Sequence, residues 1–181
     1  MRTAGILMPI TSLPSPYGVG TLGQCACDFI QFLHRAGQTY WQILPICPTG
    51  YGDSPYQSFS SYAGNPYMID FDDLKKEGLL QEEEYASISW GDNPARVDYS
   101  LLYSHKFSIL RIACSRISGV LSERFQTFCK EQNVWLNDYA LYMSIKDYYG
   151  GQSWQEWPET LQKREKDSLE AIHQELSLIH I

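Results

Sequence analysis

A long loop in the first third of the sequence carries side chains that suit a neutral, hydroxyl-rich ligand. Residues 50–66 hold tyrosines, a phenylalanine, serines and a glutamine, and Asp53 is the only charged residue among them. Aromatic rings pack against the C–H faces of a sugar, while hydroxyl and amide groups hydrogen-bond its hydroxyls after water is removed. Sugar binding is one interpretation of this composition. In the other, Tyr51, Tyr56 and Tyr62 only cover the edge of the core, and composition leaves both open.

The loop follows a predicted strand–helix–strand unit. An apolar run at residues 5–10 is typical of a buried strand, residues 22–36 have helical periodicity ending at Gly37, and residues 40–46 predict a second strand. The two strands of such a unit are parallel, and parallel α/β sheets bind ligands at the carboxyl ends of their strands. We therefore expect an α/β fold with the loop of residues 47–66 at the ligand-binding edge.

The rest of the chain is predicted to be mainly helical. A third short strand is expected at residues 67–71, a helical turn at 72–80 and a surface connection at 81–96. Helical spacing then predicts helices at residues 102–117 and 122–149 and an amphipathic segment from Pro158 onward, in which the mixed charges of residues 163–167 form a solvated face. The predicted organisation is a strand–helix–strand part at residues 1–80 and a helical part at 81–176.

Charge and cysteine usage exclude several classes of partner. The 181 residues include 14 Lys and Arg against 21 Asp and Glu, a formal net charge of -7, so neither nucleic acid nor an anionic membrane surface is an expected partner. The five cysteines are scattered and include no CxxC pair, which predicts no metal site and a reducing, cytoplasmic location.

Several motifs give the chain a specific resemblance. The N-terminal residues resemble the N-terminal part of the 4-α-glucanotransferases, also called amylomaltases or disproportionating enzymes, and weaker similarity continues to about Leu176. In order along the chain, the motifs are Gly5-Ile-Leu-Met-Pro-Ile-Thr-Ser-Leu-Pro-Ser-Pro-Tyr-Gly-Val-Gly20, Ala36-Gly-Gln, Trp41-Gln-Ile-Leu-Pro, Pro48-Thr-Gly-Tyr-Gly-Asp-Ser-Pro-Tyr-Gln-Ser-Phe-Ser60 and Ala63-Gly-Asn-Pro66.

The resemblance implies a fold and a set of substrate contacts. The family fold is a (β/α)8 barrel with helical insertions, of which this chain would hold an incomplete N-terminal part with residues 81–176 as the insertion subdomain. By similarity, Tyr56 lies beside the sugar at the cleavage point with Ser54 and Gln57 near it. The aromatics of a second glucan-binding groove match Tyr51 and Tyr103.

Two further residues of the loop are expected to support it. By the same resemblance, Asn65 fixes the loop rather than contacting the substrate. From its own sequence context, Asp53 stands next to glycine and Ser-Pro in a turn, where a carboxylate most often hydrogen-bonds its own backbone.

The resemblance also implies an activity whose catalytic groups this sequence lacks. The family transfers segments of α-1,4-glucan or maltooligosaccharide by retaining double displacement, without metal or cofactor, and its nucleophilic Asp, acid/base Glu and third Asp lie on later barrel strands. No position up to Ile181 matches them, so we expect glucan binding without catalysis and the remainder of the barrel to be missing. The alternative is a non-catalytic α-glucan-binding module. Residues 177–181 are suspected to be a non-native tail.

Overall fold

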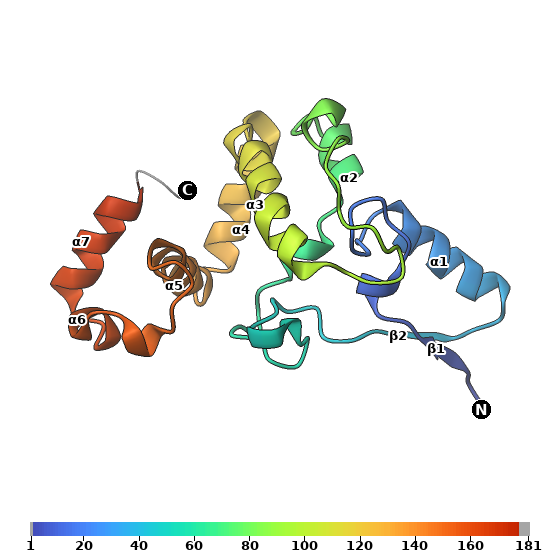
Figure 1. Ribbon diagram of the computed structural model, residues 1–181, viewed down its shortest axis with the longest axis horizontal. Coiled ribbons are helices and arrows are strands. Elements are labelled where there is room, and N and C mark those ends of the chain that lie inside the picture. Colours follow the sequence, from blue (N-terminus) through green and yellow to red (C-terminus); the bar gives the residue numbers. More distant parts are fainter. Residues whose placement is uncertain (1, 178–181) are drawn as a thin grey trace. The chain divides into compact units, whose positions relative to one another are not determined.

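The computed structural model describes residues 2–177, except the side chains of Tyr51 and Ser177. The chain forms two compact units, Met1–Glu123 and Arg124–Ile181 (Figure 1). The division expected at residue 80 separates the barrel part from the insertion subdomain, which is a different kind of boundary from that between these two units. It stays a prediction. The suspected tail lies outside the described residues from position 178 onward.

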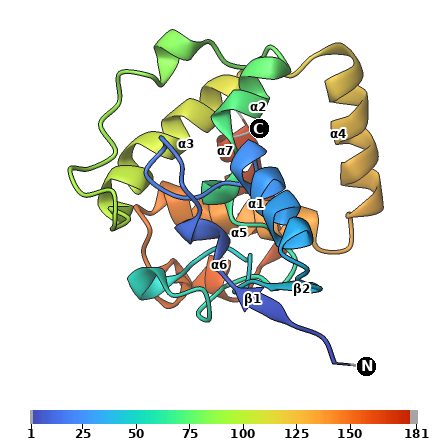
Figure 2. The ribbon, with the colours of Figure 1, turned by 90° about the vertical axis from the view of Figure 1, so that its right-hand side faces the viewer.

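The first unit begins with the predicted parallel strand–helix–strand arrangement, which is confirmed. Strands β1 (Gly5–Leu7) and β2 (Tyr40–Gln42) lie side by side in parallel, with Gly5 opposite Tyr40, and helix α1 (Gln24–Arg35) connects them (Figure 2). Glycine is required at position 5, because a Cβ there would lie 2.6 Å from the Tyr40 carbonyl oxygen.

Both strands are shorter than the sequence predicts. The ladder ends with the bond from the Met8 N–H to the Gln42 carbonyl oxygen at 3.0 Å, and Pro9 has no N–H to continue it. The 3-10 helix η1 (Ile10–Ser12) then turns the first chain away. Without a partner beyond that point, residues 43–46 of the second predicted strand run outside any ladder.

Helix α1 covers the strands with one part of its apolar stripe. Phe29 packs edge-on against Trp41 of β2, with ring centres 5.0 Å apart, and Ala26 and Leu33 are buried. Ile30 and Phe32, two further apolar residues of this helix, are each 54% exposed. The described part of the chain therefore leaves a second apolar face of α1 uncovered.

The prediction of a third strand at residues 67–71 is wrong. Residues 66–71 instead form the 3-10 helix η3 (Pro66–Met68) and the start of helix α2 (Phe71–Lys76), the helical turn that was expected. The carboxylate of Asp70 accepts hydrogen bonds from the Asp72 and Asp73 N–H groups at 2.9 and 3.3 Å and so caps α2. Side-chain caps thus override the strand propensity of an aromatic, β-branched run.

The main core of the first unit lies between α2 and helix α3 (Tyr99–Ser115). Asp98 caps α3 through the Leu101 N–H at 3.1 Å, so the helix begins earlier than predicted. Helix α4 (Gly119–Glu131) follows and contains the boundary between the two units. The buried core residues are Tyr17, Phe71, Leu79, Leu80, Tyr85, Ile109 and Ala113.

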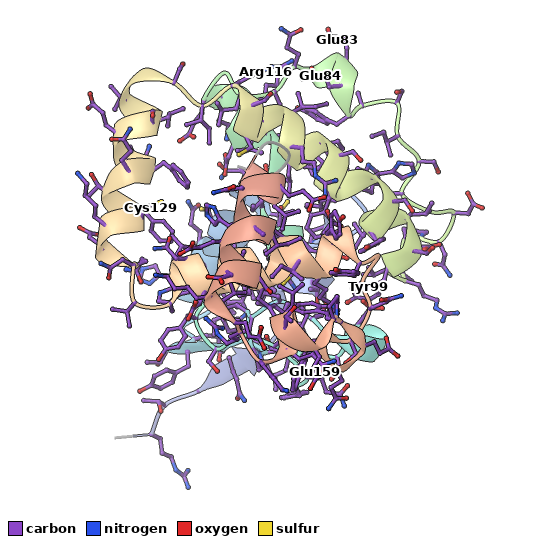
Figure 3. The ribbon with its side chains drawn as sticks, turned by 90° about the vertical axis from the view of Figure 1, so that its left-hand side faces the viewer. Glu83, Glu84, Tyr99, Arg116, Cys129 and Glu159 are labelled. Carbon is purple, nitrogen blue, oxygen red and sulfur yellow. The ribbon has the colours of Figure 1, made fainter. Side chains whose placement is uncertain are left out.

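The connection expected at the surface, residues 81–96, is anchored to this core. It contains the 3-10 helix η4 (Glu82–Glu84), followed by the buried Tyr85. Glu84 forms a bidentate ion pair with Arg116, whose two guanidinium NH2 groups donate to the two carboxylate oxygens at 2.6 and 2.7 Å. The two side chains point toward one another in Figure 3. The anchor fixes the connection against the C-terminal end of α3.

The second unit is helical, but its helices are broken where the sequence predicted continuity. The expected helix at 122–149 divides at residues 132–135, where Val134 is 90% exposed, before α5 (Leu136–Tyr148). Arg164, with φ of 55°, separates α6 (Glu159–Gln162) from α7 (Lys166–Ser177), so residues 163–167 are not one helical face. The 3-10 helix η5 (Trp154–Glu156) precedes them, and the core comprises Ile145, Trp157, Leu161, Ile172 and Leu176.

Candidate functional site

The loop after β2 begins with a turn that closes on itself. The Gly50 N–H donates to the Gln57 carbonyl oxygen at 2.8 Å, and the Gln57 N–H donates to the Ser54 carbonyl oxygen at 3.2 Å. The 3-10 helix η2 (Tyr51–Asp53) lies inside this turn. A Cβ at position 50 would lie 2.5 Å from the Gln57 carbonyl oxygen, so the closure requires glycine there.

Serine hydroxyls build a second turn directly after the first. The Ser58 hydroxyl donates to the Ser60 carbonyl oxygen at 2.8 Å, and the Ser60 hydroxyl accepts from the N–H groups of Tyr62 and Ala63 at 3.2 and 3.0 Å. Short polar side chains thereby bond the backbone of residues 58–63, which form neither helix nor strand.

Asn65 joins the end of the loop to its beginning. Its N–H donates to the Ile46 carbonyl oxygen at 2.8 Å, and its buried side-chain oxygen accepts from the Tyr67 N–H at 2.9 Å. The same side chain caps η3. This geometry supports the loop-fixing role expected for Asn65, which stays a prediction for the bound state.

Three of the predicted substrate contacts lie together in the first turn. Ser54 accepts a hydrogen bond from the Tyr56 N–H at 3.3 Å and is half-buried, whereas Tyr56 is 72% exposed and Gln57 is exposed. The turn therefore presents an aromatic ring and an amide to solvent from a closed backbone. Tyr51 lies in the same turn, and its side chain is outside the described part of the structure.

Tyr103 belongs to a second group of aromatics, on α3. Its ring lies edge-on to Phe107 at 6.0 Å, and Phe107 in turn lies 5.7 Å from the ring of Tyr67, which follows the loop. Tyr67 also lies 6.2 Å from Tyr99. Tyr103 is 60% exposed and Tyr67 is buried, so the cluster presents one face to solvent from a packed base.

Asp53 connects the loop to this cluster electrostatically. Burial raises the pKa of Tyr67 to about 12, and the charges of Asp53 and Tyr103 add to that rise. Burial, then Asp53, raises the pKa of Tyr99 as well. Asp53 therefore acts electrostatically on the aromatic cluster that carries Tyr103.

Asp53 does not make the contact that the sequence predicts. Among the described residues, no backbone N–H donates a hydrogen bond to its carboxylate, and its own backbone adopts a left-handed φ of 54°. Partial burial raises the pKa of its carboxyl group. The expected support of the turn by that hydrogen bond is thus absent, and any supporting role of Asp53 stays a prediction.

Sequence reasoning missed the base of the aromatic cluster. Tyr99, Tyr103 and Phe107 recur at every fourth residue of one helix, a spacing that puts them on one face. That periodicity was the available signal. Within residues 2–177, no three His, Cys, Asp or Glu side chains gather as metal ligands, and no helix is long and apolar enough to span a membrane.

Comparison with known proteins places this geometry in a family. A family profile described as 4-alpha-glucanotransferase matches residues 8–179, which is most of the chain. The chain belongs to the 4-alpha-glucanotransferase family. It is 43% identical over 169 residues to the 4-alpha-glucanotransferase of Clostridium butyricum, covering 93% of this chain and 35% of that protein. With the protein of that name from Thermus thermophilus, identity is 48% over 172 residues, or 93% of this chain and 33% of the relative.

Structural comparison agrees with the family assignment. An amylomaltase from Streptococcus agalactiae in complex with acarbose matches with a TM-score of 0.94 and 40% identity, over 98% of this chain and 36% of that one. This member of the 4-alpha-glucanotransferase family therefore spans about a third of the length of the relatives it matches.

Proposed function

We propose that this chain is the N-terminal portion of a 4-α-glucanotransferase, which transfers a segment of an α-1,4-glucan to an acceptor glucan or glucose. The observation that carries the proposal is the family match over residues 8–179, together with the coverage of only about a third of each relative. In this proposal β1 and β2 are the first strands of a (β/α)8 barrel completed by further sequence.

The surface of the first unit supports an incomplete barrel. Leu7 is 57% exposed and Tyr40 is 61% exposed, although both lie on strands of a parallel sheet. Parallel strands are normally buried on both faces, and closing a sheet into a barrel leaves no strand edge unpaired. Further strands and helices of the same polypeptide would cover these side chains and the exposed face of α1.

We assign substrate binding to the loop and the aromatic cluster. Tyr56, Ser54 and Gln57 contact the sugar at the cleavage point, and Tyr103 with Tyr51 contributes to a second glucan-binding groove. The exposed rings of Tyr56 and Tyr103, and a loop with Asp53 as its only charge, support binding of a neutral α-glucan or maltooligosaccharide.

The chemistry is retaining transglycosylation, and the catalytic carboxylates come from outside this chain. One carboxylate attacks the anomeric carbon, a carboxylic acid protonates the leaving oxygen, and the hydroxyl of a second glucan then displaces the enzyme. The two carboxyl groups must be held about 5 Å apart. Residues 2–177 therefore contribute binding and orientation, and a cytoplasmic location, supported by five free cysteines, belongs to the same proposal.

The test is transfer activity of the product of the whole reading frame that contains this chain. With maltotriose, we expect release of glucose together with maltooligosaccharides longer than the substrate, resolved by anion-exchange chromatography. Tyr56→Ala should lower this activity strongly and Tyr56→Phe should retain most of it, because the ring makes the contact. Binding of maltoheptaose without any change of chain length would instead establish a non-catalytic glucan-binding module.

A further inference from the structure

Asp53 carries the only charge of the loop at residues 50–66, and it is half-buried. Within residues 2–177, neither a backbone group nor a side chain donates a hydrogen bond to its carboxylate. Among the same residues, the fully buried polar side-chain atoms without a hydrogen bond belong to Lys106 and Trp157, so the Asp53 oxygens keep contact with solvent. A ligand can therefore reach this carboxylate.

An unpaired carboxylate that is partly withdrawn from water is unfavourable. Its two oxygens are hydrogen-bond acceptors only, and water normally satisfies them. Burial raises the pKa of the Asp53 carboxyl group, the direction expected when hydration is lost and no donor in the described part of the chain replaces it. Hydroxyl groups of a ligand would supply such donors, and hydrogen bonds to a charged acceptor are stronger than those between neutral groups.

The backbone at Asp53 is also in a conformation that most side chains avoid. Its φ of 54° lies in the left-handed region, which glycine adopts most readily. Arg164 is the other described non-glycine residue with a positive φ, and there an ion pair with Asp138 at 2.6 Å holds the side chain. Within residues 2–177, no comparable contact holds the side chain of Asp53. Backbone strain of this kind clusters at sites that bind ligands.

Asp53 is connected to both groups of proposed substrate contacts. It lies in η2, inside the first turn of the loop, and directly precedes Ser54. After burial, its charge is the next cause of the raised pKa values of Tyr67 and Tyr99, two members of the aromatic cluster that carries Tyr103. A glucan bound across the turn and the cluster therefore meets this carboxylate.

We infer that Asp53 is a glucan-binding residue, whose carboxylate oxygens accept hydrogen bonds from hydroxyl groups of one glucose unit. The inference rests on the proposed function and adds a contact to it. Two neighbouring hydroxyl groups of a pyranose ring can donate to the two oxygens of one carboxylate. Asp53 takes no part in bond cleavage, which the proposed function assigns to carboxylates outside this chain.

The test removes the carboxylate without disturbing the backbone, in the product of the whole reading frame. Glycine and asparagine adopt a left-handed φ readily, so Asp53→Gly and Asp53→Asn should keep the wild-type melting temperature or raise it. For Asp53→Gly, we expect KM for maltoheptaose to rise roughly 10- to 100-fold, the equivalent of one hydrogen bond to a charged group, with kcat nearly unchanged. Asp53→Asn should lose less, because its amide oxygen still accepts one hydrogen bond.

Two further comparisons separate this contact from a general effect of charge or packing. Asp92→Asn removes the same charge from an exposed residue of the connection at residues 81–96, and it should leave KM unchanged. As pH falls toward the raised pKa of the Asp53 carboxyl group, the advantage of the wild type over Asp53→Asn should shrink, because the carboxylate loses its charge. The phenols of Tyr67 and Tyr99, on which Asp53 acts, stay neutral over that range.

Three outcomes would overturn the inference. Wild-type KM in Asp53→Gly would show that the carboxylate contacts no glucan, and a loss of affinity with a lower melting temperature in both variants would show that Asp53 supports the turn instead. If the wild type transfers no glucan, the proposed function fails separately, and calorimetric titration with maltoheptaose compares the same variants. A wild type that binds no maltoheptaose in that titration is the third outcome.

Discussion

The Lys106 ammonium nitrogen lies 4.7 Å from the centre of the Phe71 ring, and both side chains are 0% exposed. Among the described residues, Lys106 Nζ has no hydrogen-bond partner. Burial lowers the pKa of Lys106 to about 8, and the charge of Asp70 opposes that shift only partly. The Phe71 ring and Asp70 stabilise the ammonium group less than water would. The charged form of Lys106 therefore destabilises the folded first unit.

The cost of burying the charged Lys106 predicts that the stability of the protein depends on pH. Below pH 8 Lys106 is charged in both states and the burial penalty is fully present. Above pH 8 the folded state loses the proton while the unfolded lysine, with its ordinary pKa of 10.5, keeps it, so the free energy of unfolding rises with pH. Between pH 8 and 10 we expect a gain of about 2 kcal/mol.

The measurement is denaturant unfolding of the product of the whole reading frame across this range, with Lys106→Met as the comparison. Methionine keeps the length of the side chain and removes the charge. The variant should be the more stable protein at pH 7.5, and its advantage should shrink toward pH 10. The same difference at both pH values would show that Lys106 does not titrate in this range.

The Glu84–Arg116 ion pair predicts sensitivity to acid. Hydrogen bonds from Arg116 and from the Gln81 backbone lower the pKa of Glu84 to about 2, from 4.5. A lowered folded-state pKa means that the pair stabilises the fold above pH 4.5 and that this contribution disappears as pH falls through about 2. Glu84→Gln should lower the melting temperature at pH 7. The drop in melting temperature between pH 7 and pH 3 should also be smaller in this variant than in the wild type.

Glu83→Gln is the matched control for this pair. Glu83 is the preceding residue of η4 and is exposed (Figure 3). Its substitution by glutamine removes the same charge and leaves the ion pair of Glu84 with Arg116 intact. Differential scanning calorimetry at both pH values should give an unchanged melting curve for Glu83→Gln. An equal effect of the two variants would mean that net charge, and not the pair, is responsible.

The turn that carries Tyr56 predicts a strict requirement for Gly50. Alanine at position 50 would place its Cβ 2.5 Å from the Gln57 carbonyl oxygen, whereas a Cβ at Gly64 has nothing within 4 Å and needs no unusual φ. Gly50→Ala should therefore open the first turn and speed limited proteolysis of the loop, and Gly64→Ala should not. Equal proteolysis of both variants would contradict the closed-turn geometry.

Much of the first unit follows from its sequence because local signals agree there. The apolar runs around residues 5 and 40 and the stripe of α1 predict the parallel pair, but the lengths of the strands depend on where Pro9 removes a donor. The 66–71 segment contains strand-forming residues and still forms helical turns, because the side chains of Asn65 and Asp70 cap them. One of these caps, Asn65, directly precedes the segment, and the other, Asp70, lies within it.

The sequence predicts which residues form the candidate site better than it predicts how they are arranged. The loop motif identifies Tyr56 and its neighbours, and the spacing of α3 could have identified the base beneath Tyr103. That the charge of Asp53 raises the pKa of Tyr67 and of Tyr99 was not predictable, because it depends on how the chain folds between residues far apart in the sequence. Long-range packing, not local propensity, decided its environment.

The exposed apolar surface predicts how residues 2–177 behave when expressed alone. Ile6 and Leu7 on β1, Tyr40 on β2 and the outer face of α1 remain in contact with water, and the sheet has unpaired edges. Such surfaces associate with one another. Sedimentation velocity should therefore show aggregates or a partly unfolded chain. A monomer with one cooperative thermal transition would contradict the incomplete-barrel account.

Glucan transfer from maltotriose tests the central claim most directly. The product of the whole reading frame should release glucose and form longer maltooligosaccharides in matching amounts, whereas residues 2–177 alone should do neither. A full-length product that binds maltoheptaose yet leaves the length distribution of maltotriose unchanged would contradict the account and leave glucan binding as the function of this loop.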